Sequence, residues 1–164
     1  MNKLKDYYSI LDNLISKKVI VDAYGGDDAD GEILCDFYEL FCKFPEEETP
    51  IWAESYIQLY SWQFQNYHEG LDGYYDNFYG HTSHTNINRA GIYLKDIGYD
   101  EVAEYLLMAV HTLAWDEMTE KEKELYKEEL CKISEWIDSN RETIFKTYVD
   151  ILMINKESIL KLNK

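Results

Sequence analysis

The sequence predicts an all-α protein, folded as a single compact domain of six to eight helices. Apolar residues recur at spacings of three and four, which is typical of helices that bury one face. No stretch shows the sustained alternation of apolar and polar residues that a half-buried sheet needs. The two prolines lie where helices are expected to end or begin. The chain of 164 residues is close to the ~150 of one domain, so we expect one acidic helical domain over 1–164.

The first two helices are predicted from apolar stripes. A helix over 3–22 places on one stripe the residues Leu4, Tyr7, Leu11, Leu14 and Ile15. Asp30 is suited to cap a second helix over 31–44. This helix must stop before Pro45, because the residue that precedes a proline disfavours the α region.

The third helix is predicted from Thr49 and Pro50, read as an N-cap followed by proline at the first helical position. It continues to about His68. Four aromatic residues follow one another at steps of four within it: Trp52, Tyr56, Tyr60 and Phe64. Such a ridge is more often part of a core than of a ligand site, and we predict a core role.

The middle of the chain contains shorter pieces. A short helical piece is expected in LDGYYDNFYG, which is followed by a polar loop, HTSHTN. The next helix, capped at Thr85 or Asn86, ends at Gly98. Asp100 is expected to cap a further helix over 101–115.

Two capping boxes are predicted in the last third. In this motif a hydroxyl and a carboxylate three residues apart satisfy two backbone N–H groups at the start of a helix. The pairs are Thr119 with Glu122 and Ser139 with Glu142. They predict a C-terminal helical pair within 119–154, with helices over 120–138 and 140–154.

The charge is unevenly distributed. The chain carries 16 Lys and Arg against 32 Asp and Glu, a formal charge of −16. Segments 1–18 and 143–164 each carry +2, so 19–142 carries −20; no Lys or Arg occurs between Phe44 and Asn88. This balance excludes direct binding of nucleic acid and docking on anionic lipid, and favours a basic protein as partner.

Cysteine usage and hydropathy predict the compartment. No apolar run approaches 18 residues, and 1–16 lacks the apolar core and cleavage site of a signal peptide. Three cysteines form neither an even set nor a CxxC pair, so we expect a cytoplasmic protein. Cys35 and Cys42, two helical turns apart, are predicted to be buried.

Two segments, HEGLDGYYDNFYG at 68–80 and LKDIGYDEVAEYLLMAVHTL at 94–113, resemble the bacterial DNA-mimic protein family, whose shared domain is otherwise of unknown function. The family-like core covers about 55–113. Residues that follow the family pattern are Gly70, Leu71, Tyr74, Tyr75, Asn77, Gly80, Leu94, Ile97, Gly98, Ala103 and Ala109. The chain departs from the pattern at His68, Glu69, Gly73 and Tyr99.

The resemblance implies an all-helical domain. In the member that gave the family its name, an acidic face occupies the DNA-binding surface of a repressor. The matching residues are typical of a scaffold: glycine suits positive φ, Asn77 suits a bond to loop backbone, and aromatic side chains pack the junction. No catalytic set is implied.

Residues that could carry chemistry are few. His81 and His84 are the best metal ligands, with Asp76 and His68 as further ligands, but no second cluster or HExxH motif accompanies them. We therefore expect a solvated loop, no metal and no cofactor. Carboxylate pairs such as Asp72 with Asp76, or Asp100 with Glu104, arise by chance among 32 acids, so we do not expect an enzyme.

The sequence therefore favours an acidic protein-binding module that mimics DNA and occupies the basic nucleic-acid-binding surface of a partner such as a transcription factor. The predicted face consists of Asp27, Asp28, Asp30, Glu32, Asp36, Glu39, Glu46, Glu47 and Glu48. An immunity or antitoxin-like inhibitor of a basic nuclease uses the same electrostatics, and a small metal-dependent hydrolase is the second alternative. The sequence is also compatible with a homodimer.

Overall fold

The computed structural model describes residues 3–21, 23, 32–76, 83–110 and 115–162. Its elements, in order, are α1 (Lys3–Lys17), α2 (Glu32–Phe41), η1 (Glu46–Glu48), α3 (Ile51–His68), α4 (Leu71–Asp76), α5 (Ser83–Asp96), α6 (Asp100–Leu107), η2 (Trp115–Glu117), α7 (Glu120–Ser139), α8 (Arg141–Ile154) and α9 (Lys156–Lys161). These ranges contain nine α-helices, two short 3₁₀ helices (η) and no strand. The all-α prediction is confirmed; α9 is the helix that the sequence did not predict.

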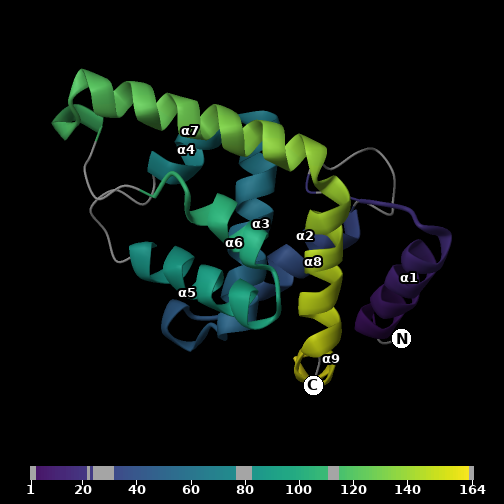
Figure 1. Ribbon diagram of the computed structural model, residues 1–164. Coiled ribbons are helices and arrows are strands. Elements are labelled where there is room, and N and C mark those ends of the chain that lie inside the picture. The colour runs from purple at the N-terminus through teal and green to yellow at the C-terminus, as the bar shows by residue number, and fades with distance from the viewer. Residues whose placement is uncertain (1–2, 22, 24–31, 77–82, 111–114, 163–164) are drawn as a thin grey trace.

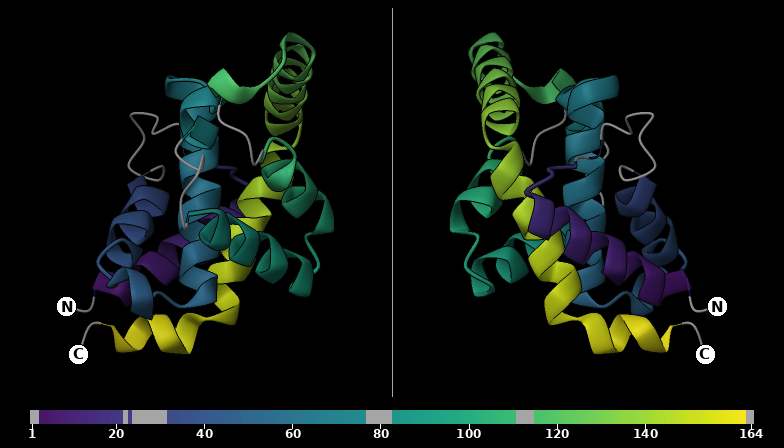
Figure 2. Two further views of the ribbon diagram at one scale, coloured as in Figure 1. Left: turned by 90° about the vertical axis from the view of Figure 1, so that its left-hand side faces the viewer. Right: turned by 90° about the vertical axis from the view of Figure 1, so that its right-hand side faces the viewer.

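Helix α3 lies at the centre and contacts α2, α4, α5, α7 and α8 (Figure 1). The long helix α7 crosses one end of α3, and α8 turns away from it and runs back along the molecule. Helix α9 follows α8 and packs against α1, so both ends of the chain lie on the same side (Figure 2). One hydrophobic cluster takes buried residues from all nine α-helices.

Helix α1 is shorter than predicted. It ends at Lys17 because Lys18 adopts a positive φ of 56° and its N–H and that of Val19 bond back to Ile15 and Leu14 (3.1 and 2.9 Å). This arrangement satisfies carbonyls that a helix end leaves free. Leu14 is buried as predicted, whereas Ile15, in the last turn, is 43% exposed.

Helix α2 also ends early, at Phe41, three residues before the predicted end. Cys42 therefore lies beyond the helix and is exposed, and Cys35 is only half-buried. The prediction that both cysteines are buried is wrong. The capping role predicted for Asp30 lies outside the described residues.

The predicted start of α3 is wrong by one position. Pro50 takes the N-cap position and Ile51 is the first helical residue. The Thr49 hydroxyl donates instead to the Pro45 carbonyl oxygen (3.0 Å), because Thr49 closes the 3₁₀ turn that precedes it.

The core role predicted for the four residues of the aromatic ridge of α3 is confirmed for the middle two. Tyr56 and Tyr60 are buried, while Trp52 and Phe64 are half-buried. The Tyr56 ring packs on Phe41 with a centroid distance of 5.2 Å, an edge-to-face contact that aromatic pairs favour. The ridge therefore joins α3 to α2.

The ends of α5 and α6 confirm one prediction and correct three. The predicted cap at Thr85 or Asn86 is wrong, because both residues lie inside α5, which begins at Ser83. Gly98, with φ of +89°, ends α5: its N–H bonds to Lys95 and that of Tyr99 to Leu94 (2.9 and 2.8 Å). The predicted cap at Asp100 is wrong, because Tyr99 takes the N-cap position and Asp100 is the first helical residue. Helix α5 begins at Ser83 and α6 ends at Leu107, so both predicted spans differ; 111–114 lies outside the described residues.

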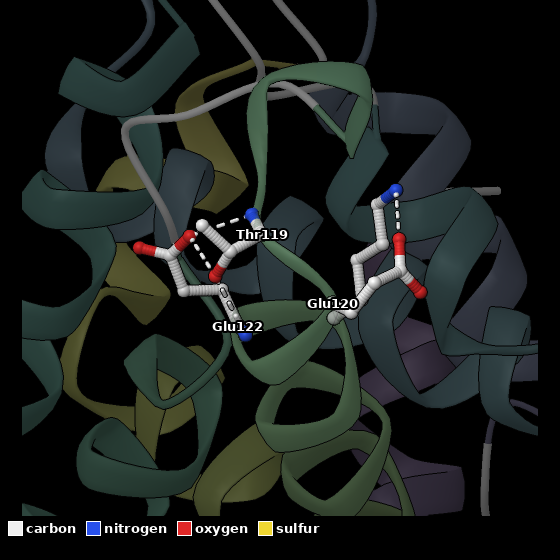
Figure 3. A network of polar contacts seen from close by, with 4 residues as sticks. Thr119, Glu120 and Glu122 are labelled. Carbon is white, nitrogen blue, oxygen red and sulfur yellow. Dashed lines mark hydrogen bonds and ion pairs between the residues drawn. The ribbon is translucent and has the colours of Figure 1, made fainter.

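The capping box at Thr119 is confirmed (Figure 3). The Thr119 Oγ1 atom accepts from the Glu122 N–H (3.3 Å), and the Glu122 carboxylate accepts from the Thr119 N–H (2.7 Å). On the neighbouring side, Lys123 pairs with Glu120 at 3.1 Å. This cap fixes the start of the longest helix.

The capping box predicted at Ser139 and Glu142 is wrong. Ser139 is the last residue of α7, and Asn140 is the only residue between α7 and α8. The Asn140 side chain donates to the Trp136 carbonyl oxygen (2.8 Å), so it closes α7 instead of capping α8. A one-residue junction leaves no room for a separate extended N-cap.

Buried tyrosine hydroxyls tie pairs of helices together. Each of four donates to a backbone carbonyl of another helix: Tyr8 to Leu152 (2.9 Å), Tyr56 to Leu34 (3.0 Å), Tyr75 to Leu106 (2.9 Å) and Tyr148 to Leu59 (3.2 Å). An unpaired buried hydroxyl costs ~1–3 kcal/mol, so these bonds select one packing of the helices.

We expect Thr119→Ala to lower the free energy of unfolding by ~1 kcal/mol, because it removes the side-chain acceptor of the capping box. Ser139→Ala is the matched control and should change it by less than ~0.5 kcal/mol. Urea denaturation of both variants measures the difference. Equal losses would contradict the assignment of the cap.

We expect stability to fall steeply in alkali. Burial raises the pKa of Tyr8, Tyr56 and Tyr75 above the ordinary value of ~10. Below pH ~10 these protonated tyrosines contribute fully to stability. Above pH ~10 the tyrosines of the unfolded chain ionise first, which lowers the free energy of unfolding by about 1.4 kcal/mol per pH unit for each tyrosine. Tyrosinate absorbance should therefore rise together with unfolding. Complete ionisation of a still helical protein near pH ~10 would contradict the buried network.

Candidate acidic binding face

The outer side of α2 carries a line of carboxylates. Glu32, Asp36 and Glu39 follow one another at spacings of four and three, which places them on one face of the helix. The opposite face buries Ile33, Leu34, Phe37 and Phe41. Because the apolar face is fixed against the core, the acidic line is held toward solvent.

Asp36 is the carboxylate of this line that contacts side chains of another helix, α1. Its carboxylate accepts a hydrogen bond from the Tyr7 hydroxyl and lies 3.6 Å from the Lys3 ammonium. Burial, and then the bond to Asp36, raise the pKa of Tyr7, which keeps the hydroxyl protonated as a donor. An exposed ion pair such as Lys3 with Asp36 is weak, so the line remains acidic.

Three further carboxylates follow α2 in the short helix η1. Glu46, Glu47 and Glu48 are all exposed. The turn is closed by the Glu48 N–H, which donates to the Pro45 carbonyl oxygen (2.9 Å). We call the carboxylates of α2 and η1 the acidic face: Glu32, Glu39, Glu46, Glu47 and Glu48 are exposed, and Asp36 is half-buried.

Glu54 is acidic but belongs to the interior. It is 6% exposed and its Oε1 atom accepts from the Gln58 amide (2.7 Å). The Tyr74 hydroxyl donates to the Oε1 atom of Gln58 (2.7 Å), which extends the chain of bonds to α4. Glu54 also lies near the start of α3, where the helix dipole favours a negative charge. Its spacing of four to Gln58 is the only sequence signal for this role.

The structure places only part of the predicted site. It describes Glu32, Asp36, Glu39 and Glu46 to Glu48, whereas Asp27, Asp28 and Asp30 lie outside the described residues. His81 also lies outside them, and the side chain of His84 is not described. Among the residues that the structure does describe, no group of three His, Cys, Asp or Glu is arranged to hold a metal ion.

The residues of the family-like pattern form part of the helical scaffold. Leu71, Tyr74 and Tyr75 are buried and Ile97 is half-buried. Gly70 has a φ of +95°, and a Cβ there would lie 2.8 Å from the Asp72 carboxylate, so this turn requires glycine. The glycine roles predicted for Gly70 and Gly98 are confirmed; Asn77 and Gly80 lie outside the described residues.

The basic ends of the chain meet at α1 and α9. The Lys156 ammonium lies 4.5 Å from the centre of the Tyr8 ring, which is a cation–π distance. Lys5, Ser9 and Asp12 line with them a cleft of about 330 Å³. Sequence reasoning counted the charge of each end but missed that the two ends pack together.

None of the helices in the described ranges combines the length and the apolar character needed to cross a membrane. Comparison of the chain with protein-family models, with curated proteins and with solved structures gives no match. The function is therefore inferred from the geometry and charge of this molecule.

We expect Asp76→Asn to stabilise the protein at neutral pH. Burial, and then the neighbouring Asp72 carboxylate, raise the pKa of Asp76. A raised pKa in the folded state means that the protonated form is favoured by folding and that ionisation costs stability as pH rises through it. The melting temperature of the variant should exceed that of the parent at pH ~7, and the gain should vanish at pH ~3, below the unfolded value of ~3.9.

Glu128→Gln, an exposed carboxylate on α7, is the control for this change. A gain for Asp76→Asn no larger than for the control would show that Asp76 carries no local strain. A gain that persists unchanged at pH ~3 would show that it does not come from ionisation.

Proposed function

We propose that the protein is a non-enzymatic binding module whose acidic face occupies the basic, nucleic-acid-binding surface of a partner protein, and so acts as a DNA mimic. The observation that carries the proposal is the line of carboxylates on α2, continued by η1. Lys3 pairs with one member of the line, Asp36, and Lys43 lies between α2 and η1. From Phe44 to Asn88, which includes η1, the sequence contains no lysine or arginine.

The spacing of charge on α2 supports a likeness to DNA. From Glu32 to Glu39 the helix rises about 10 Å at ~1.5 Å per residue. One strand of duplex DNA places about three phosphates in that length, at ~3.4 Å per phosphate. Three carboxylates on α2 therefore match the linear charge density of one strand, and a surface that binds a phosphate backbone is complementary to them.

The partner class is a basic protein that binds nucleic acid, whether it regulates transcription or, as in an immunity-type inhibitor, cleaves nucleic acid. Association is steered by long-range attraction, which salt screens beyond ~8 Å at physiological ionic strength. Three free cysteines, two of them exposed, favour a reducing compartment, and we place the protein in the cytoplasm.

Charge reversal tests which surface binds. Glu46→Lys, Glu47→Lys and Glu48→Lys, combined, should slow association with a basic partner captured from native lysate at low salt. Glu124→Lys, Glu128→Lys and Glu135→Lys, combined, make the same charge change at exposed positions of α7. Surface plasmon resonance at several salt concentrations measures both association rates.

We expect the η1 variant to lower the association rate at least about tenfold more than the α7 variant, because rim charges act mainly on association. Equal losses would show that only the total charge matters and would contradict a localised face. Failure to capture any basic partner at low salt would contradict the proposed function itself.

A further inference from the structure

A groove lies beside the acidic face, between α2 and α3. Its volume is about 270 Å³, and it is lined by Cys35, Tyr38, Glu39, Tyr60, Ser61, Phe64 and Gln65. Glu39 belongs to the acidic face, so the groove and the face share an edge.

The walls of the groove include stacked aromatic rings. Tyr38 of α2 stacks on Tyr60 of α3 with a centroid distance of 4.5 Å and an interplanar angle of 24°. Phe64, one turn further along α3, stacks on Tyr60 at 6.1 Å and 16°. Tyr60 is buried, whereas Tyr38 and Phe64 remain partly exposed. The His68 ring also packs on Phe64, with a centroid distance of 4.1 Å.

The charge around the groove is negative. The described residues that line it include one carboxylate, that of Glu39, and no lysine or arginine. Burial raises the pKa of Tyr38 and Tyr60, so both remain neutral rings at physiological pH. The groove therefore offers aromatic surface and negative charge together.

We propose that this groove is a binding site for the side chain of an arginine on the basic partner. The guanidinium group packs against the rings of Tyr38 and Phe64 and pairs with the Glu39 carboxylate. The inference rests on the proposed function, because it supplies the specific contact within an otherwise electrostatic association.

Arginine fits the groove better than lysine for two physical reasons. A guanidinium is planar, so it stacks on aromatic surface while its edge donates two parallel hydrogen bonds to a carboxylate. It is also more weakly hydrated than an ammonium group, so it loses less hydration free energy when it leaves water. Ring and carboxylate together therefore select arginine, whereas carboxylates alone attract both cations.

Hexa-arginine and hexalysine, peptides of equal length and charge, provide the test. At low salt, calorimetric titration of the full chain should give a dissociation constant about fivefold lower for hexa-arginine, the size expected of a cation–π contact at a partly exposed site. Tyr38→Leu should bring the ratio close to one, whereas Tyr38→Phe, which keeps the ring, should preserve it. Glu39→Gln should weaken the binding of hexa-arginine more than Glu135→Gln does. Glu135 is an exposed residue of α7, so its variant is the charge control.

A second measurement needs no variant. Because Cys35 lines the groove while Cys131 lies exposed on α7, bound hexa-arginine should slow alkylation of Cys35 relative to Cys131. Cys42 contacts Tyr38 and so is not a remote control. Mass spectrometry reports the three rates. This readout stays informative if Tyr38→Leu fails to fold.

The outcomes separate the two proposals. Equal binding of both peptides, with no selective protection of Cys35, would overturn the arginine site and leave the acidic face intact. Weaker binding of both peptides on reversal of Glu46, Glu47 and Glu48, with an unchanged ratio of their dissociation constants, would support both proposals. Absence of binding by either peptide at low salt would contradict the proposed function together with the groove.

Discussion

The fold depends on hydrogen bonds that join α3 to its surroundings, because this helix is surrounded by α2, α4, α5, α7 and α8. Gln63, fully buried, accepts through its Oε1 atom from the Ala23 N–H at 3.0 Å. The Tyr148 hydroxyl shares its single hydrogen between this atom (3.0 Å) and the Leu59 carbonyl oxygen (3.2 Å). Glu54 is paired through Gln58, and the Tyr56 hydroxyl reaches the Leu34 carbonyl of α2. The bonds of Gln63 and Tyr56 join α3 to other parts of the chain, and each lowers the cost of a buried polar group. The buried Gln63 Nε2 and Gln65 Oε1 atoms find no hydrogen-bond partner among the described residues.

This central constraint also determines the charge distribution of the surface. Once Phe37 and Phe41 are fixed against Tyr56, the opposite face of α2 must point to solvent with its carboxylates. The packing of α9 on α1 gathers lysines from both ends of the chain. The result is a molecule with an acidic face and a smaller basic region, which net charge alone does not describe.

The features that the sequence predicted correctly depend on residues that are neighbours in the chain. The capping box at Thr119 and the glycine stop at Gly98 need only three to five consecutive residues, and both are present. The box at Ser139 failed because α7 and α8 are joined through Asn140 alone, which a residue pattern does not reveal. Cys42 was placed in a helix that ends one residue earlier, at Phe41.

Features that depend on distant residues could not be predicted. The groove exists because Tyr38 and Tyr60, from different helices, stack at 4.5 Å. The acidic face was predicted in part, since the spacing of Glu32, Asp36 and Glu39 indicates one helix face, but its link through Tyr7 to α1 required the structure.

The central claim is that basic partners bind at α2 and η1. The most direct test is to follow backbone amide chemical shifts by NMR while an arginine-rich peptide is added at low salt. The account predicts that the largest shifts lie within 32–48 and in the part of α3 that lines the groove, and that those of α7 stay small. Shifts spread evenly over every acidic helix, or largest in α7, would contradict it.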